Sequence, residues 1–154
     1  MNYFGIDPGQ TGGIALITAL FTKVWTMPVE DKGVDCRQLK EILSSVKQAT
    51  VFIERVHAMP GQGVTSMFNF GQGYGKIKGC LEAMGMEYQL VTPQAWKKKV
   101  LEGMDWKGRK VASVEYCQDH YPEISLLRTP RCKKAHDGLS DALCIAEYGR
   151  LTVE

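Results

Sequence analysis

The chain has 154 residues, of which 44% are hydrophobic and 23% charged. This composition is typical of one globular domain, expected here over residues 1–154, and it excludes a fibrous or disordered chain. The formal net charge of +2 is too small to demand a nucleic-acid partner by itself. The sequence has neither a signal-like segment nor an apolar run near the about 18 residues of a membrane span. We therefore expect a cytoplasmic protein without a membrane partner, with its five dispersed cysteines as free thiols.

The first third of the chain predicts strands and one helix. Two apolar runs, 4–7 and 14–17, flank a glycine-rich turn and predict paired strands. A third strand is expected over 21–27, where Pro28 ends it. Asp35 and Gln38 then form a capping-box pattern, and apolar residues at helical spacing follow as far as Val46. The run 50–54 is almost entirely apolar, as in strands that are buried on both faces.

The rest of the chain predicts mainly helices. A helix over 65–84 carries Gly71, Gly75 and Gly79 four residues apart, so one of its faces has no side chains. Each such glycine costs about 1 kcal/mol relative to alanine, and we expect another helix or backbone to pack closely against this face. A strand over 87–91 precedes a short helix that opens at Pro93. Further helices are predicted over 107–121 and from 136 to about 147, with a mobile basic loop over 122–135 between them.

Four acids occupy special places in this pattern. Asp7 and Glu54 each end a buried strand, so they would lie side by side if those strands are neighbours in the sheet. Asp137 and Asp141 are four residues apart on the last helix, which puts their Cβ atoms about 5–6 Å apart. Taken alone, the Asp-Pro-Gly sequence at Asp7 suits equally well a turn in which the carboxylate bonds its own backbone.

Clustered carboxylates repel one another unless a cation lies between them. Mg²⁺, with Mn²⁺ as its substitute, prefers oxygen ligands and commonly binds through carboxylates, water and phosphate. Pairs of such ions about 3.5–4 Å apart serve phosphodiester cleavage in many nucleases. The four acids therefore predict a magnesium site with nuclease chemistry.

Four stretches together resemble a known family: 5–9 (GIDPG), 51–54 (VFIE), 92–97 (TPQAWK) and 136–143 (HDGLSDAL). In this order they resemble the RuvC family of Holliday junction resolvases, within the ribonuclease H-like superfamily, over nearly the whole chain. The compact length and the Trp-Lys-Lys segment are more similar to the phage and viral branch. The resemblance implies an α/β ribonuclease H-like fold: a mixed five-stranded sheet flanked by helices, in the order β-β-β-α-β-α-β-α.

The resemblance also implies roles for particular residues. The strand acids of the family correspond to Asp7 and Glu54, and its last helical acid corresponds to Asp141. Family members often carry the fourth ligand three residues before the last acid, where this chain has Gly138. Asp137 and His136 are the two candidates; we favour Asp137 as ligand, with His136 positioning the attacking water or bonding backbone.

A structure-selective endonuclease acting as a homodimer on four-way junctions is the activity that this resemblance implies. The residues expected to contact DNA are basic or, like His57, able to stack on bases: His57, Lys76, Lys78, Lys97, Lys98, Lys107, Arg109, Lys110, Arg131, Lys133 and Lys134. For any single basic run, a solvated surface is the simpler interpretation.

Three other functions share parts of this pattern. The run Asp7-Pro8-Gly9-Gln10-Thr11 also matches the phosphate loop of actin-like ATPases and sugar kinases, but those need a second lobe, for which this chain has no room. A catalytically inactive protein that binds branched DNA would not need all four acids. A nuclease selective for forks or flaps would use the same site, and the sequence does not separate it from a junction resolvase.

Overall fold

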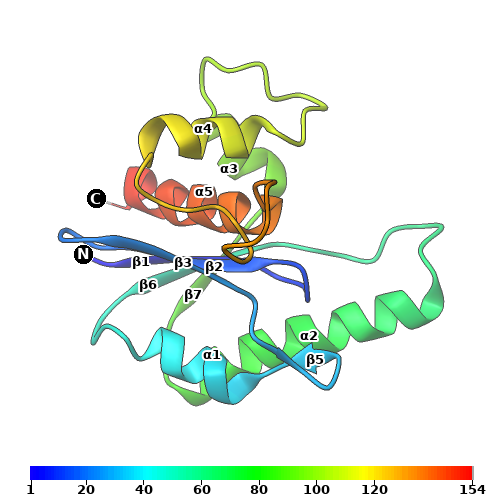
Figure 1. Cartoon of the computed structure of the whole chain (residues 1–154). Coiled ribbons are helices and arrows are strands. Elements are labelled where there is room, and N and C mark those ends of the chain that lie inside the picture. Colours follow the sequence, from blue (N-terminus) through cyan, green and yellow to red (C-terminus); the bar gives the residue numbers. More distant parts are fainter. Residues whose placement is uncertain (154) are drawn as a thin grey trace.

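The computed structural model describes residues 1–153 and contains a mixed five-stranded sheet between two layers of helices (Figure 1). The strands lie in the order β3-β2-β1-β6-β7. Their bounds are β1 (Tyr3–Asp7), β2 (Gly13–Ile17), β3 (Thr22–Thr26), β6 (Thr50–Glu54) and β7 (Tyr88–Val91). The first three pair antiparallel, whereas β6 is parallel to both β1 and β7. The predicted α/β fold and its five strands are confirmed.

The central strands are apolar because the sheet is covered on both faces. Side chains alternate between the faces, so Phe4 and Ile6 of β1 pack toward one helical layer while Tyr3 packs toward the other. In the same way, Val51 and Ile53 of β6 face one core and Phe52 faces the other. The sheet is thereby fixed in register between two separate hydrophobic clusters.

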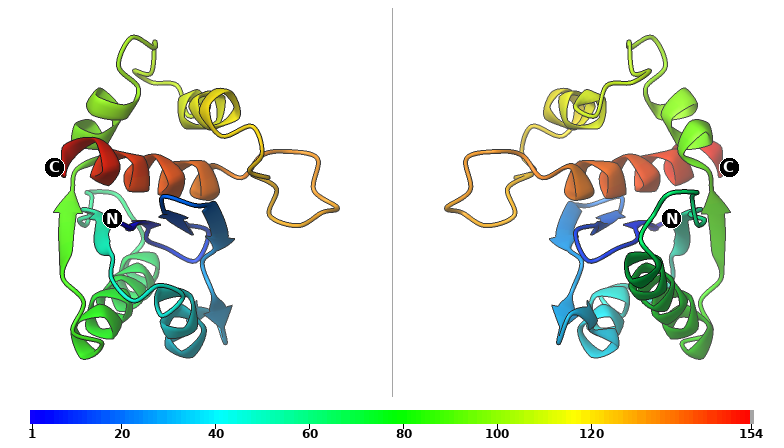
Figure 2. Two further views of the ribbon diagram at one scale, coloured as in Figure 1. Left: turned by 90° about the vertical axis from the view of Figure 1, so that its left-hand side faces the viewer. Right: turned by 90° about the vertical axis from the view of Figure 1, so that its right-hand side faces the viewer.

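The helices divide between the two faces (Figures 1 and 2). On one face lie α1 (Cys36–Leu43) and α2 (Val64–Ala83); on the other lie α3 (Pro93–Val100), α4 (Ala112–His120) and α5 (Asp137–Thr152). Asp35 caps α1 by accepting hydrogen bonds from the backbone N–H groups of Arg37 and Gln38, at 2.9 and 3.3 Å. The predicted cap at Asp35 is thus confirmed, but the second bond of a capping box is not formed, because the Asp35 N–H donates to the Pro28 carbonyl at 2.9 Å.

Helix α5 lies directly on the sheet. A Cβ atom at Gly5 in β1 would overlap the backbone of Ala142 and Ala146 in α5, so only glycine allows this approach. The predicted apolar stripe of α5, which includes Leu139 and Leu143, is buried. This contact sets the height of α5 above the carboxyl end of β1.

The structure differs from the prediction chiefly at two helix ends and in one additional hairpin. Helix α4 begins at Ala112, not at 107, because Gly108 adopts a positive φ of 73° in the preceding turn. Helix α5 continues beyond 147 to Thr152, where Arg150 bonds the buried Glu147 at 2.6 Å. A two-stranded hairpin, β4 (Val29–Glu30) and β5 (Gly33–Val34), was not predicted. Its two turn residues, Asp31 and Lys32, both adopt positive φ, where such hairpins usually carry Asn-Gly or Asp-Gly, so the turn lacks the usual sequence signal.

The glycine face of α2 is open in this chain. No described atom outside the helix backbone lies within 4 Å of a Cβ placed at Gly71, Gly75 or Gly79. The close packing that we expected there is therefore not provided by residues 1–153. Among the same residues, no helix is both long and apolar enough to cross a membrane. Glu154, the last residue of the predicted domain, lies outside the described residues.

Candidate metal centre and active site

Two of the four predicted acids end adjacent parallel strands. β1 and β6 pair up to Ile6 and Ile53, and Asp7 and Glu54 are the next residues on each strand. On the other side of β6, Glu54 pairs with Val91 of β7. The backbone therefore brings both carboxylates to one edge of the sheet, as the sequence predicted.

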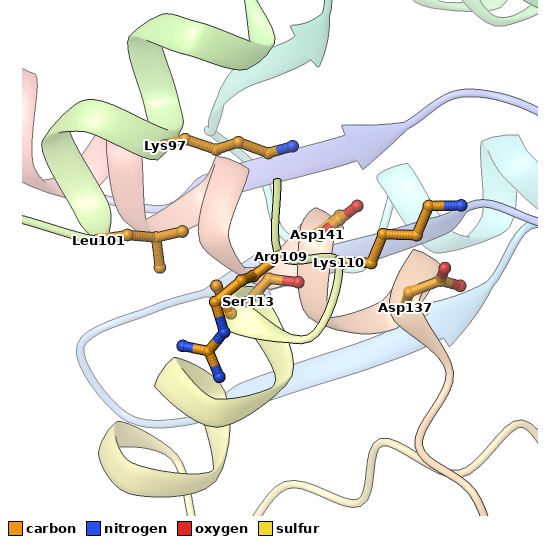
Figure 3. A pocket seen from close by; sticks show the side chains of 8 residues that line it. Lys97, Leu101, Arg109, Lys110, Ser113, Asp137 and Asp141 are labelled. Carbon is orange, nitrogen blue, oxygen red and sulfur yellow. The ribbon is translucent and has the colours of Figure 1, made fainter. Parts of the chain in front are cut away.

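The other two acids come from the first two turns of α5. Asp137 is the first residue of the helix, and Asp141 follows one turn later. The helix begins against the turn after β1, because a Cβ atom at Gly138 would overlap the carbonyl oxygen of Thr11. Figure 3 shows both carboxylates on the same stretch of α5, in a cavity of about 230 Å³. The start of α5 is thus held against the sheet edge that carries Asp7.

The four acids form one electrostatic cluster. Burial, followed in size by the charges of Asp141, Glu54 and Asp137, raises the pKa of Asp7 from 3.8 to about 8. Burial likewise raises the pKa of Asp141 to about 6, against the opposing effects of the Ser113 hydroxyl and the Lys97 ammonium. Near neutral pH this site therefore holds protons that a bound cation would displace.

The donor chemistry fits a hard divalent cation, since all four groups are carboxylates. Among residues 1–153, however, no three His, Cys, Asp or Glu side chains converge closely enough to hold a metal ion as they stand. The four acids interact electrostatically, but they do not form a complete coordination shell in this structure.

Several predicted basic residues surround the acids. Lys97 of α3, together with Arg109 and Lys110 from the segment before α4, lines the cavity of Asp137 and Asp141. In Figure 3, Lys97 and Lys110 lie on the side of the acids, while the Arg109 guanidinium points away from them. That guanidinium donates to Glu115 at 2.6 Å. Lys97 and Lys110 are therefore the cations best placed beside the carboxylates.

A second cavity, of about 520 Å³, adjoins the first and extends the basic surface. Lys133 and Lys134 of the 122–135 loop line it, and Lys110 and Asp137 belong to both cavities. Arg131, Lys98 and Lys107 are exposed, but they line neither of these cavities. Lys97, Lys110, Lys133 and Lys134 thus form a basic margin of the two adjoining cavities, on the α3–α5 side of the sheet.

The remaining predicted DNA contacts lie on the other side of the sheet. Lys76 of α2 donates to the Val34 carbonyl at 3.3 Å. Lys78 lies 4.7 Å from the ring centre of Tyr74. His57 lines a separate cavity of about 210 Å³ with Tyr74. These three residues are not brought to the acidic pocket.

His136 is the residue before the first turn of α5. Its side chain makes no capping hydrogen bond, and it lines the second cavity and not the one shared by Asp137 and Asp141. Its buried Nδ1 atom has no hydrogen-bond partner among the described residues. This placement favours Asp137 over His136 as the fourth acid-site ligand, although that assignment stays a prediction.

Two residues of the site were not predicted. Ser113 of α4 lies buried beside Ser140 of α5, with 3.0 Å between their hydroxyl oxygens, and it lowers the pKa of Asp141. Trp96 of α3 donates its indole N–H to Glu54 at 2.8 Å. In the sequence both residues resemble ordinary core positions of amphipathic helices, and only the packing of α3 and α4 reveals their contacts with the acids.

No model of a protein family matches the sequence, and a search of curated proteins finds no match. Solved structures do match over nearly the full chain. RuvC of Thermus thermophilus in complex with a Holliday junction substrate has a TM-score of 0.62 and 15% identity, covering 98% of this chain and 94% of that one. A second structure of Thermus thermophilus RuvC has a TM-score of 0.60 and 19% identity, and again covers 98% of this chain and 94% of that one.

A viral enzyme shows the same likeness. The fowlpox virus resolvase, solved with its substrate Holliday junction DNA, has a TM-score of 0.53 and 14% identity, covering 97% of each chain. At these identities the likeness establishes the fold. The chain has the ribonuclease H-like fold of the RuvC resolvases, as its motifs predicted.

Proposed function

We propose that this protein is a divalent-metal-dependent endonuclease that cuts branched DNA, with four-way junctions as its substrate. The observation that carries the proposal is the single electrostatic cluster formed by acids from β1, β6 and α5 at one sheet edge. Burial, together with the charges of the other three acids, raises the pKa of Asp7 to about 8, an arrangement that is costly without a counter-charge. Asp137 and Asp141 of this cluster line a cavity open to solvent, a placement that a purely structural role does not explain.

Asp7, Glu54, Asp137 and Asp141 would hold Mg²⁺, or Mn²⁺ as its substitute. When bound, the metal supplies Lewis acidity toward the phosphate and a more acidic water as nucleophile. The chain itself positions the ligands, because the backbone of β1, β6 and α5 fixes the Cα atoms of the four acidic residues. Lys97 offsets part of their negative charge, as its lowering of the Asp7 and Asp141 pKa values indicates.

The basic margin supports a nucleic-acid substrate. Lys97, Lys110, Lys133 and Lys134 line the two adjoining cavities around the acids, where they can contact phosphates on either side of the cut. The choice of a four-way junction rests on the fold shared with RuvC and the fowlpox virus resolvase, both solved with Holliday junction DNA. On this proposal the protein is associated with DNA in the cell.

Resolution of a junction needs two symmetric cuts, which a twofold homodimer with one site per subunit supplies. Helix α2 offers a face for the second copy. Val64 and Phe68, 82% and 65% exposed, continue the row of Gly71, Gly75 and Gly79 along one side of the helix. An exposed apolar and glycine face of this length suits close helix packing between subunits.

The test is cleavage of an immobile four-way junction beside duplex, fork and flap DNA in Mg²⁺, with the cuts mapped on each strand. The proposal predicts paired, symmetric nicks in the junction and little cutting of the duplex. Preferential cutting of forks or flaps would show that the substrate is one of these branched DNAs and not the four-way junction. Tight binding to the junction without cutting in Mg²⁺ or Mn²⁺ would identify a catalytically inactive binder and overturn the proposal.

A further inference from the structure

The path of the chain through β7 and α3 brings Trp96 next to Glu54. Glu54 pairs with Val91 at the end of β7, and the next residue, Arg55, donates its N–H to the Val91 carbonyl at 2.6 Å. Thr92 then caps α3 by accepting from the N–H of Ala95 at 3.2 Å, and the helix turns back over the end of β6. Trp96 therefore returns to Glu54 five residues after the strand pairing ends.

The indole of Trp96 is fully buried, at 0% exposure. Its N–H is a donor only, and an unpaired donor at such depth would be costly. It donates to Oε1 of Glu54 at 2.8 Å. This bond occupies one carboxylate oxygen. Because the ring cannot move without repacking the core, it also fixes the direction in which the other oxygen points. The Glu54 carboxylate is thus held in one orientation by its bond to Trp96.

We infer that Trp96 is a positioning residue that orients the Glu54 carboxylate for metal binding, and so sets metal affinity at the proposed site. The inference rests on the proposed function, since it needs Glu54 to be a ligand. Partners that orient a metal ligand typically contribute 10–100-fold to affinity, because the ligand no longer loses rotational freedom on binding. Trp96 touches neither substrate nor metal in this account and acts only through Glu54.

A substitution to phenylalanine alone would confound the lost N–H with a lost ring. The sharper variant places 3-benzothienylalanine at position 96, which keeps the bicyclic shape and replaces N–H by sulfur. Trp106→Phe serves as the matched control, because Trp106 packs against the same core but bonds none of the four acids. The readouts are Mn²⁺ affinity by calorimetry without DNA, the Mg²⁺ concentration for half-maximal cutting, and the melting temperature.

The expected result for the isostere is a loss of about 10–100-fold in Mn²⁺ affinity, with DNA binding in the absence of metal unchanged. In a Glu54→Ala background the same replacement should cause no further loss of Mn²⁺ affinity. Wild-type affinity and cutting by the isostere would overturn the role of Trp96 while leaving the proposed function standing. A wild-type protein that binds no Mn²⁺ and cuts no DNA would instead overturn the proposed function, and this inference with it.

Discussion

Asp7 and Glu54 stand one residue beyond Ile6 and Ile53, the last paired residues of two adjacent parallel strands. Both acids lie at the same edge of the sheet because each directly follows the last residue that pairs its strand with the other, with no loop between. Helix α5, held against β1 by Gly5, adds Asp141 to the same cluster. The site therefore rests on strand and helix backbone, which is the most rigid support that a small α/β fold provides.

The pKa of Asp7 predicts how stability depends on pH without metal. The folded state keeps a proton up to about pH 8, whereas the unfolded chain releases it near 3.8, so Asp7 costs stability progressively as the pH rises between those values. Asp7→Asn should therefore raise the melting temperature in EDTA by about 5 °C or more at pH 8 and by little at pH 4. Thermal scans across this range, with Asp119→Asn on the exposed side of α4 as control, measure the difference. An effect of equal size at both pH values would contradict the raised pKa.

Metal binding should depend on pH for the same reason. Asp7 and Asp141, with pKa values raised to about 8 and about 6, must lose protons before they can bind a cation. We expect Mn²⁺ affinity to rise from pH 6 to pH 8, by up to about tenfold per pH unit for each proton released. Calorimetry in two buffers of different ionisation enthalpy counts the protons. Binding without proton release would show that these acids are not the ligands.

The sequence predicts the acids well because each lies at the end of an element with strong patterning. Strand β6 is apolar over residues 51–53 and ends in an acid, and Asp137 and Asp141 stand opposite a regular apolar stripe. Where a strand or helix is unambiguous, a polar residue at its end is easy to place. The two strand patterns therefore predict that Asp7 and Glu54 lie side by side if the strands are neighbours, and the structure shows that the strands are adjacent.

The contacts that the sequence could not predict arise between elements distant in the chain. Trp96 has the pattern of a core residue, and its hydrogen bond to Glu54 depends on how α3 turns back over β6. Lys76 belongs to a basic pattern but faces β5, where it bonds Val34. Periodicity fixes which side of a helix is buried, but not which functional group lies opposite it.

The fourth ligand can be identified by comparing neighbouring residues. Asp137 lines the cavity of Asp141, whereas His136 lines the adjacent one. We expect Asp137→Asn to lower the cutting rate by about 10²–10³-fold, nearly as much as Asp141→Asn, the size of effect found when one preorganised electrostatic group is removed from an active site. His136→Ala should keep measurable cutting in Mg²⁺. Single-turnover rates on one junction decide the ranking, and an inactive His136→Ala beside an active Asp137→Asn would make His136 the essential residue.

The proposed dimer has its own test on α2. Light scattering at micromolar concentration should give twice the chain mass of 17.2 kDa. Gly75→Glu should shift the protein toward monomer without unfolding it, because a Cβ at Gly75 meets no described atom within 4 Å outside the helix backbone. Gln118→Glu, an equal change of charge on the exposed side of α4, should leave the dimer intact. A wild-type monomer, both free and on junction DNA, would refute this assembly.

The most direct test of the proposed catalytic site is junction cleavage by the Glu54→Gln variant. This change removes one negative charge from the cluster but keeps the size of the side chain and an oxygen that can accept from Trp96. We predict that cutting in Mg²⁺ falls to background while affinity for the junction stays within about twofold, because binding rests on lysine and arginine contacts to phosphate. Undiminished cutting by Glu54→Gln would contradict the proposal that the four acids form the catalytic site.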